Sequence, residues 1–451
     1  MAFAAQAARL AASALVAGVV AAVVAMPVPA AGGVCFDRIF SFGDSLTDTG
    51  NFLLSVPDDF PDPARSLPYG QTFFGRPSGR YSDGRNLLDF FAEAFGMPFV
   101  PPYLGGGDFL NGANFAVGGA TALNNSFFRE LGVEPTWTPH SLDEQMQWFK
   151  RLLPSIASTE SGMNRKQVIS TCGAIEKSNS GTHAGNHPGW PITALNVYIA
   201  AISRNLKEHS DIMSKSLFLV GEVGGNDYNH LMVRGKSLAE LRELVPQVVG
   251  AISLAITELI ILGAKKFVVP GNFPIGCVPL YLAILPSEEK DYYNEEIGCI
   301  KWLNEFTEYH NRLLQEELEK LRNLHPDVSV IYADYYGATL NIYRAPLQFG
   351  FTVPLNSCCG SDAPHNCSLS VLCGNPGSFV CPDPSKYVSW DGLHFTEATY
   401  KVIIQGVLGS YAVPPLSEIC RDGEYKVSQL HQCTDSNPTN TVTYDAMSSF
   451  I

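Results

Sequence analysis

The stretch Phe42-Gly43-Asp44-Ser45-Leu46-Thr47-Asp48-Thr49-Gly50-Asn51 places one serine among residues that favour turns. The run before it, Ile39–Phe42, is rich in β-branched and aromatic residues, which predicts a buried strand. Gly43 and Asp44 predict the turn that ends this strand. Ser45 would then lie beyond the carboxyl end of a strand, where open α/β sheets bind their ligands.

Ser45 is therefore a candidate nucleophile. A Gly-Asp-Ser tripeptide on its own more often marks a turn serine that caps the next helix. The catalytic interpretation depends on partner residues elsewhere in the chain.

The N-terminus carries an apolar stretch, residues 11–24, with Arg9 before it and small residues up to Ala31 after it. This pattern predicts a secretory signal peptide, residues 1–31, with cleavage near Ala30 or Ala31. A membrane anchor fits less well because the apolar run is short for a span. The strongest later candidate, residues 251–262, is interrupted by polar side chains and predicts a buried helix, so we expect no stable membrane insertion.

The chain is acidic. It has 30 basic and 44 acidic side chains and a formal net charge of −14. Loss of residues 1–31 would remove one basic side chain and no acidic one, which makes the charge −15. A nucleic-acid partner would favour a basic face, so we expect none.

The chain has 11 cysteines, and five of them lie between Cys358 and Cys381 among glycines and prolines. In a secreted chain this spacing predicts a loop closed by disulfides. A metal site is less consistent, because no C-x-x-C pair faces another and His365 stands alone. Asn124 and Asn366 lie in N-x-S motifs and are candidate glycosylation acceptors.

Predicted strands alternate with predicted helices along residues 34–412. This alternation predicts a parallel sheet covered on both faces, a three-layer sandwich in one large domain. The predicted strands are Ile39–Phe42, a second strand within residues 109–121, Ser216–Val220, Lys266–Pro270 and Val328–Ala333. The predicted helices are residues 86–95, 141–153, 238–262, 291–324 and a helix from Thr396.

Two segments stand outside this pattern. Residues 161–207 are polar, show no clear amphipathic period and contain Cys172, without which the cysteine count would be even. They predict an atypical insertion. From residue 413 to residue 451 the sequence becomes polar and predicts a loose C-terminal tail.

Asp391 and His394 are separated by three positions near the end of the predicted domain. If a turn separates them, the carboxylate can orient the imidazole and the imidazole can reach a serine. A turn aspartate and a capping histidine are the structural alternative. Ser45, two glycine turns and this pair all fall where a parallel sheet would bring its strand ends to one edge.

These residues resemble the GDSL esterase/lipases, also called SGNH hydrolases, in their plant secreted branch. The resemblance runs from about Phe36 to Tyr411. Its blocks are Gly43-Asp44-Ser45-Leu46, Asn114-Phe115-Ala116-Val117-Gly118-Gly119-Ala120, Gly224-Gly225-Asn226-Asp227 and Asp391-Gly392-Leu393-His394. The insertion departs from the family pattern, either as a retained intron or as a lineage-specific loop.

The resemblance implies a flavodoxin-like α/β/α fold with a five-stranded parallel sheet. It implies Ser45 as nucleophile, His394 as base and Asp391 as its orienting acid. The oxyanion hole would combine the Ser45 amide, the Asn226 side chain and the amide of Gly119, with Gly118 as the alternative glycine. Asp44 is then interpreted as a turn residue, and neither a metal nor an organic cofactor is expected.

The expected function is a secreted carboxylic ester hydrolase that forms an acyl-enzyme in the apoplast or cell wall. Acetyl, phenolic and lipid esters all remain open as substrates, whether small molecules or part of the cell wall. The expected assembly is a monomer. The alternative is a catalytically silent protein of the same fold that binds glycans.

Overall fold

The structure is a computed structural model that describes residues 36–133, 138–160 and 209–419. The predicted signal peptide, the predicted insertion at 161–207 and residues 420–451 of the predicted tail lie outside the described residues.

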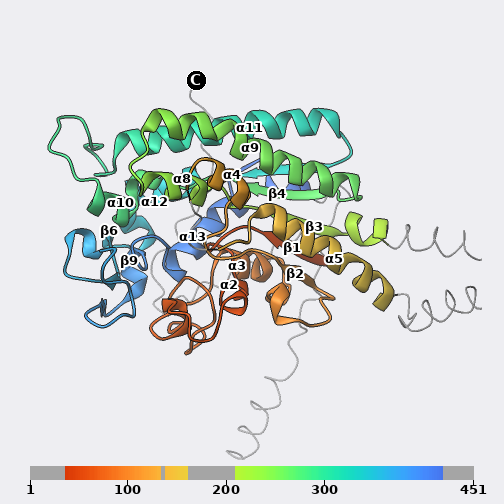
Figure 1. Cartoon of the computed structure of the whole chain (residues 1–451), viewed down its shortest axis with the longest axis horizontal. Coiled ribbons are helices and arrows are strands. Elements are labelled where there is room, and N and C mark those ends of the chain that lie inside the picture. The colour runs from red at the N-terminus through yellow and green to blue at the C-terminus, as the bar shows by residue number, and fades with distance from the viewer. Residues whose placement is uncertain (1–35, 134–137, 161–208, 420–451) are drawn as a thin grey trace, which may run out of the picture.

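A six-stranded sheet has the order β10-β5-β4-β3-β1-β2. Its strands β1 to β4 lie at the centre of the molecule (Figure 1). Its strands are β1 (Arg38–Phe42), β2 (Gly112–Asn114), β3 (Ser216–Val220), β4 (Lys266–Pro270), β5 (Ser329–Ala333) and β10 (Ala412–Val413). The first five pair in parallel, which confirms the predicted parallel sheet. The short edge strand β10 runs antiparallel to β5 and was not predicted.

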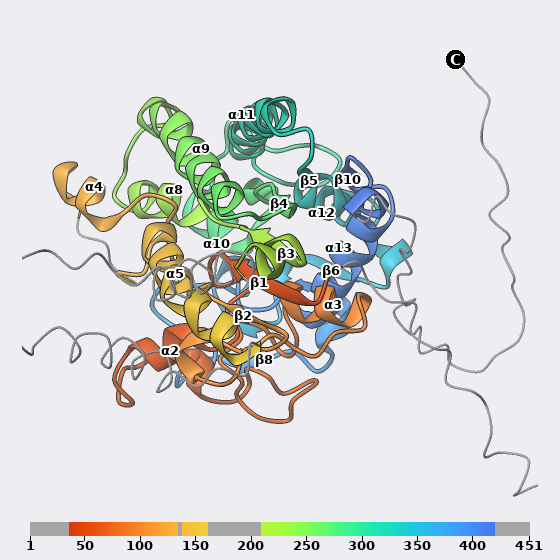
Figure 2. The same ribbon diagram turned by 90° about the vertical axis from the view of Figure 1, so that its right-hand side faces the viewer.

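Helices cover both faces of the sheet (Figure 2). Side chains of α5 (Leu142–Glu160), α9 (Leu238–Ile261) and α11 (Lys301–Leu324) share one hydrophobic core with Phe40 and Phe218 of the sheet. Side chains of α3 (Leu87–Ala94), α12 (Tyr335–Arg344) and α13 (Glu397–Leu408) share the other core with Ile39 and Leu217. Successive strand residues point to opposite faces, so neighbours in one strand enter different cores. The predicted three-layer α/β/α fold is confirmed.

Smaller elements surround these layers. The remaining α-helices of the described residues are α2 (Asn51–Ser55), α4 (Asn125–Glu130), α8 (Gly225–Met232) and α10 (Pro279–Ile284). Strand β6 (Val353–Ser357) pairs in parallel with β9 (Tyr387–Ser389), and β7 (Cys359–Gly360) pairs with β8 (Phe379–Val380) in antiparallel fashion.

Helix α3 begins where its sequence provides a cap. The Asn86 side chain accepts a hydrogen bond from the Asp89 backbone N–H, and the Asp89 carboxylate accepts one from the Asn86 N–H. This capping box satisfies two N–H groups that have no partner inside the helix.

Helix α11 is shorter than predicted, since it begins at Lys301 and not at Asp291. Gly298 has a φ of +73°, and Cys299 is joined to Cys277 by a disulfide. Both features hold the preceding residues in a loop, where the amphipathic pattern alone suggested a continuous helix.

The packed body also extends further than the predicted tail boundary at residue 413. Val413 pairs with Tyr332 of β5, and the side chains of Leu416 and Ile419 are buried. Apolar side chains spaced three apart anchor this segment although its overall composition is polar.

Residues 358–381, here called the disulfide loop, are closed by two of the three disulfides among the described residues. Cys358 bonds Cys381 and Cys359 bonds Cys373. The loop closed by disulfides agrees with the prediction, whereas the pairing itself was not predicted. Cys367 lies in the same loop as a buried free thiol.

Helix α9 is the one helix in the described ranges whose length and composition would allow it to cross a membrane. Of its most apolar stretch, 56% is buried inside the protein. Its buried face belongs to the core shared with α5 and α11, so it packs as a core helix of this fold.

Candidate active site

The structure brings Ser45, His394 and Asp391 together in one hydrogen-bonded chain. Ser45 Oγ lies 2.8 Å from His394 Nε2, and His394 Nδ1 lies 2.7 Å from Asp391 Oδ2. Ser45 follows β1, and the other two residues lie in the turn between β9 and α13. The pairing therefore joins segments that are 349 positions apart in the sequence.

The turn that carries Asp391 and His394 is shaped by its own side chains. Asp391 Oδ1 accepts hydrogen bonds from the backbone N–H groups of Leu393 and His394, at 3.0 and 2.8 Å. Gly392 between them has a φ of +94°. A Cβ atom at this position would lie 2.3 Å from Cys367 Sγ, so both conformation and space require glycine.

Electrostatics support a charged carboxylate beside the imidazole. Burial alone would raise the pKa of Asp391, but the charge and hydrogen bonds of His394 outweigh it and lower the pKa to about 2. Burial alone would lower the pKa of His394, but Asp391 in particular raises it above the usual value. The pair can hold a proton that arrives from Ser45.

The loop that carries Ser45 is anchored from the neighbouring helix. Gln145 of α5 accepts a hydrogen bond from the Gly43 N–H at 2.9 Å and donates one to the Gly43 carbonyl at 2.8 Å. Both partners are buried. The sequence does not predict this contact, because a glutamine in a helix carries no local signal for a partner 102 positions away.

Asp48 connects the Ser45 loop with the second sequence block, residues 114–120, here called the glycine block. Its carboxylate accepts hydrogen bonds from four backbone N–H groups, namely those of Gly50, Asn51, Phe52 and Gly118. Burial raises the pKa of Asp48 to about 6. The sequence pattern around Ser45 predicts no role for Asp48.

The glycine block presents its two candidate amides differently. The Gly118 N–H donates to Asp48 Oδ2 at 2.8 Å, and the ring of Tyr81 would lie 2.6 Å from a Cβ at position 118. Gly119 has a φ of +77°. Among the described residues no acceptor is found for the Gly119 N–H.

Asn226 belongs to the third block, lies in the first turn of α8 and faces the residue before Ser45. Its side-chain nitrogen donates to Asp44 Oδ2 at 2.9 Å and to the Ala120 carbonyl at 3.0 Å. Its neighbour Asp227 accepts hydrogen bonds from the N–H groups of Ala122 and Leu123. Asn226 and Asp227 thus fasten the chain beyond the glycine block to α8.

Asp44 shapes the loop and also pairs with a second acid. Its Oδ1 accepts a hydrogen bond from the Leu46 N–H at 3.0 Å, which agrees with its interpretation as a turn residue. Its carboxyl group also hydrogen-bonds that of Glu222, so one of the two must carry a proton. Burial raises the pKa of Asp44 to about 6, and burial with the Asp44 charge raises the pKa of Glu222 well above its usual range. Because burial and the Asp44 charge raise the pKa of Glu222 so strongly, we assign the shared proton to Glu222.

Two tyrosines of the loop between α2 and α3 complete the site, and local sequence patterns did not indicate them. The Tyr81 ring stacks on the His394 imidazole, with 4.9 Å between centroids, and its hydroxyl donates to Asp62. The Tyr69 hydroxyl donates to Asp391 Oδ2 at 2.8 Å.

A cavity of about 60 Å³ opens beside Ser45 and His394. One wall is apolar and includes Phe273, Ile275 and Val278. Asn229 and Tyr281, which hydrogen-bond each other, supply polar groups to the lining. The cavity exceeds the roughly 10–15 Å³ that one water needs, and it accommodates a small organic group.

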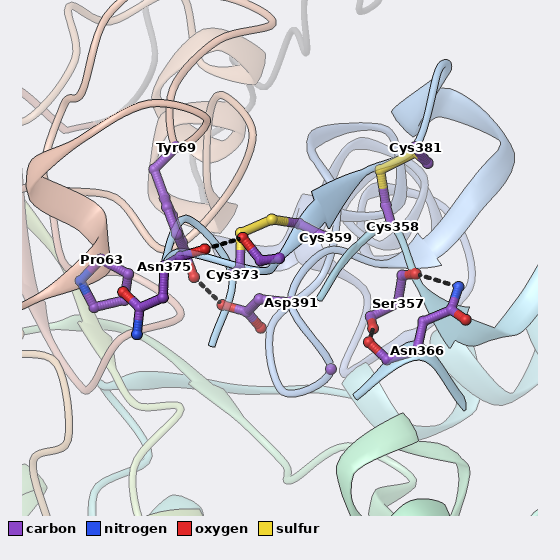
Figure 3. Close-up of a disulfide and its surroundings, with 12 residues drawn as sticks. Pro63, Tyr69, Ser357, Cys358, Cys359, Asn366, Cys373, Asn375, Cys381 and Asp391 are labelled. Carbon is purple, nitrogen blue, oxygen red and sulfur yellow. Dashed lines mark hydrogen bonds between the residues drawn. A yellow bond between two sulfur atoms is a disulfide. The ribbon is translucent and has the colours of Figure 1, made fainter. Parts of the chain in front are cut away.

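The two candidate glycosylation acceptors differ in their surroundings. Asn124 is exposed, and its side-chain oxygen caps α4 by accepting from the Phe127 N–H. Asn366 is half-buried in the disulfide loop, and its side-chain nitrogen donates to the Ser357 carbonyl at 3.1 Å (Figure 3).

No group of three or more His, Cys, Asp or Glu side chains in the described ranges is arranged to hold a metal ion.

A serine that hydrogen-bonds an imidazole, itself paired with a buried carboxylate on an α/β/α fold, is the arrangement of a serine hydrolase. Comparison with known proteins agrees with this class. The family of GDSL-like lipases and acylhydrolases matches residues 39–407. The chain belongs to this family and is a hydrolase of ester bonds.

Individual relatives cover most of the chain. One GDSL esterase/lipase of Arabidopsis thaliana is 44% identical over 402 residues, which are 88% of this chain and 90% of the relative. A second from the same plant is 43% identical over 394 residues, 86% of each chain. A sinapine esterase of Brassica napus is 39% identical over 391 residues, 86% of this chain and 89% of the relative.

Proposed function

We propose that the protein is a secreted carboxylic ester hydrolase that works through an acyl-enzyme on Ser45. The single observation that supports this most strongly is the hydrogen-bonded chain from Ser45 through His394 to Asp391. Ser45 Oγ attacks the ester carbonyl carbon while His394 Nε2 takes its proton. His394 then returns the proton to the leaving alcohol, and an activated water hydrolyses the acyl-enzyme.

The oxyanion that forms on the carbonyl is held by the backbone amides of Ser45 and Gly119 and by the side-chain amide of Asn226. Gly119 is preferred over Gly118 because the Gly118 N–H already donates to Asp48. Both hydrogens of the Asn226 amide have acceptors in the substrate-free protein. Asn226 must therefore share or release one of these bonds when the oxyanion forms.

The cavity beside Ser45 favours a short acyl group. Its volume of about 60 Å³, room for roughly four to six waters, suits a short acyl group better than a long lipid chain. The relative that is named a sinapine esterase motivates a test of sinapine and other phenolic esters as well.

Secretion to the apoplast or cell wall is supported by the N-terminal apolar stretch and by three disulfides among the described residues. Of the two N-x-S sites, the exposed Asn124 offers easier access to a glycan than Asn366. The proposed enzyme acts as a monomer on an ester substrate, without nucleic acid and without a cofactor. The hydrogen-bonded chain at Ser45 disfavours a catalytically silent glycan-binding protein.

The test is a hydrolysis panel on the purified full chain with p-nitrophenyl acetate, acetylated xylan, sinapine and a triglyceride. Ser45→Ala should reduce kcat/KM for p-nitrophenyl acetate by more than about a thousandfold. Ser41→Ala is the matched control, because the Ser41 hydroxyl is buried in β1 with no hydrogen-bond partner among the described residues. Full activity in Ser45→Ala would refute the proposal.

A further inference from the structure

Tyr69 lies beside the carboxylate of the proposed triad, although it comes from a loop 322 positions earlier in the sequence. Its hydroxyl donates a hydrogen bond of 2.8 Å to Asp391 Oδ2 (Figure 3). The side chain is buried, with 2% of its surface exposed. We propose that Tyr69 is a positioning residue that holds the Asp391 carboxylate against His394 and sets the basicity of that pair. This inference rests on the proposed function.

Asp391 accepts four hydrogen bonds. Its Oδ1 is held by the backbone N–H groups of Leu393 and His394. Its Oδ2 is shared between His394 Nδ1 and the Tyr69 hydroxyl. The first three donors belong to the turn that carries Asp391. Tyr69 is thus the donor that fixes the carboxylate relative to the rest of the protein.

Tyr69 has the chemistry that a neutral donor needs at this position. Burial, followed by the charge of Asp391, raises the pKa of its hydroxyl well above the usual value. The hydroxyl therefore keeps its proton at the neutral pH at which the pair acts. A phenol of this kind donates to the carboxylate without neutralising its charge, so it weakens the attraction of Asp391 for an imidazolium only in part.

The surroundings hold the Tyr69 ring in place. The ring packs edge-to-face on Trp390, the residue before Asp391, with 5.8 Å between centroids. Residues of the disulfide loop contact Trp390 and Pro68, the residue before Tyr69. The Cys359 N–H donates to the Trp390 carbonyl at 2.7 Å, and a Cβ at Gly374 would lie 3.5 Å from the ring of Pro68. Tyr69 thus connects the α2–α3 loop, the disulfide loop and Asp391.

Removal of the hydroxyl has a defined electrostatic consequence. In Tyr69→Phe the carboxylate loses one donor and attracts the imidazolium more strongly, so the pKa of His394 rises. Activity requires neutral His394, and the acidic limb of the kcat/KM profile should therefore shift to higher pH. The other titratable groups that act on His394 or Asp391 stay unchanged in this variant. They are Asp44, Asp62, Tyr81, Tyr400 and the thiol of Cys367.

The experiment measures kcat, KM and the pH profile for p-nitrophenyl acetate with the full chain. Tyr69→Phe should lower kcat by roughly 3- to 10-fold, the effect of one hydrogen bond, and should leave KM unchanged because Tyr69 does not line the cavity. Tyr343→Phe is the matched control. Tyr343 is buried in α12, and its hydroxyl has no hydrogen-bond partner in the described part of the chain.

A second variant avoids dependence on the folding of Tyr69→Phe. Site-specific 3,5-difluorotyrosine at position 69 keeps the shape and makes the hydroxyl a stronger donor, so the acidic limb should shift to lower pH. Opposite shifts in the two variants support the inference. If both pH profiles coincide with that of Tyr343→Phe while Ser45→Ala is inactive, the role proposed for Tyr69 is wrong and the proposed function is unaffected. Full activity in Ser45→Ala overturns the proposed function itself.

Discussion

Asn226 donates a hydrogen bond of 2.9 Å from its side-chain amide to the carboxylate of Asp44, the residue directly before Ser45. The other Asp44 oxygen holds the Leu46 N–H. One buried carboxylate thus shapes the loop of the proposed nucleophile and orients a proposed oxyanion donor. We therefore expect catalysis to be sensitive even to a substitution of Asp44 that keeps the side-chain volume.

Asp44→Asn should lower kcat by roughly 10- to 100-fold with little change in KM, since one amide oxygen cannot serve both donors. Glu222→Gln should stay within about threefold of wild type, because the new amide can still donate to Asp44 and accept from the Gly225 N–H. Steady-state kinetics with p-nitrophenyl acetate measures both. A wild-type kcat in Asp44→Asn would contradict the role of Asp44.

The buried acids also predict how stability depends on pH. Burial raises the pKa of Asp44 and Asp48 to about 6 and that of Asp227 to about 7. These groups bind protons more tightly in the folded protein, so the free energy of unfolding should decrease as pH rises from about 4 to about 8. The raised pKa of His394 acts in the same direction. The lowered pKa values of His230 and His310, about 4 and about 3, oppose this decline below about pH 6.5, but the raised acids outnumber them. Asp391, with a pKa of about 2, opposes it only below about pH 4.

Thermal melting between pH 4 and pH 8 measures this dependence in the full chain. The melting temperature should be highest near pH 4–5. Glu222→Gln should flatten the decline because it removes one group whose pKa is raised on folding. Glu319→Gln, on the exposed side of α11, should leave the decline unchanged. A melting temperature that increases from pH 5 to pH 8 would disprove the proposed protonation states.

The disulfide Cys359–Cys373 should stabilise the segment next to Asp391. Its loss in the double variant Cys359→Ser, Cys373→Ser should lower the free energy of unfolding by about 3 kcal/mol, as expected for a loop of this length. Denaturant unfolding provides the measurement. Cys367→Ser, at a buried thiol without a disulfide, serves as the control and should cost less than about 1.5 kcal/mol. Equal losses in the two variants would argue against a specific role of this disulfide.

The apolar wall of the cavity should set the preferred acyl length. Ile275→Ala enlarges the cavity, so the ratio of kcat/KM for p-nitrophenyl butyrate to that for acetate should increase by about 5- to 10-fold, the effect of one or two methylene groups. Leu347→Ala, at a side chain that is 76% exposed, should not change this ratio. An unchanged ratio in Ile275→Ala would mean that the acyl group binds elsewhere.

Local patterns predicted the layers well because the periodicity of strands and helices depends on residues that are close in the sequence. Four of the five parallel strands lie within their predicted segments, and β1 begins one residue earlier, at Arg38. Strand β2 has only three residues. The predictions of element boundaries failed where a contact between residues far apart in the sequence determines the local structure. The Cys277–Cys299 disulfide lies just before α11, which begins at Lys301. The two-residue strand β10 is defined by its pairing with β5.

In the candidate site too, residues with a local sequence signal were predicted and residues with only long-range contacts were not. Ser45, Asn226, Asp391 and His394 follow strand ends or glycine turns, so their convergence could be expected from the topology. Gln145 and Tyr69 lie in a helix and in an irregular loop, and only the folded chain reveals their partners, Gly43 and Asp391.

The most direct test of the central claim is covalent labelling of the full chain with a fluorophosphonate. Trypsin should release residues 39–65 as one peptide, because no Lys or Arg lies between Arg38 and Arg65. Fragmentation should place one adduct on Ser45, with none in Ser45→Ala and much slower labelling in His394→Ala. Labelling at another residue, or none in a chain that hydrolyses p-nitrophenyl acetate, would contradict Ser45 as the acyl carrier.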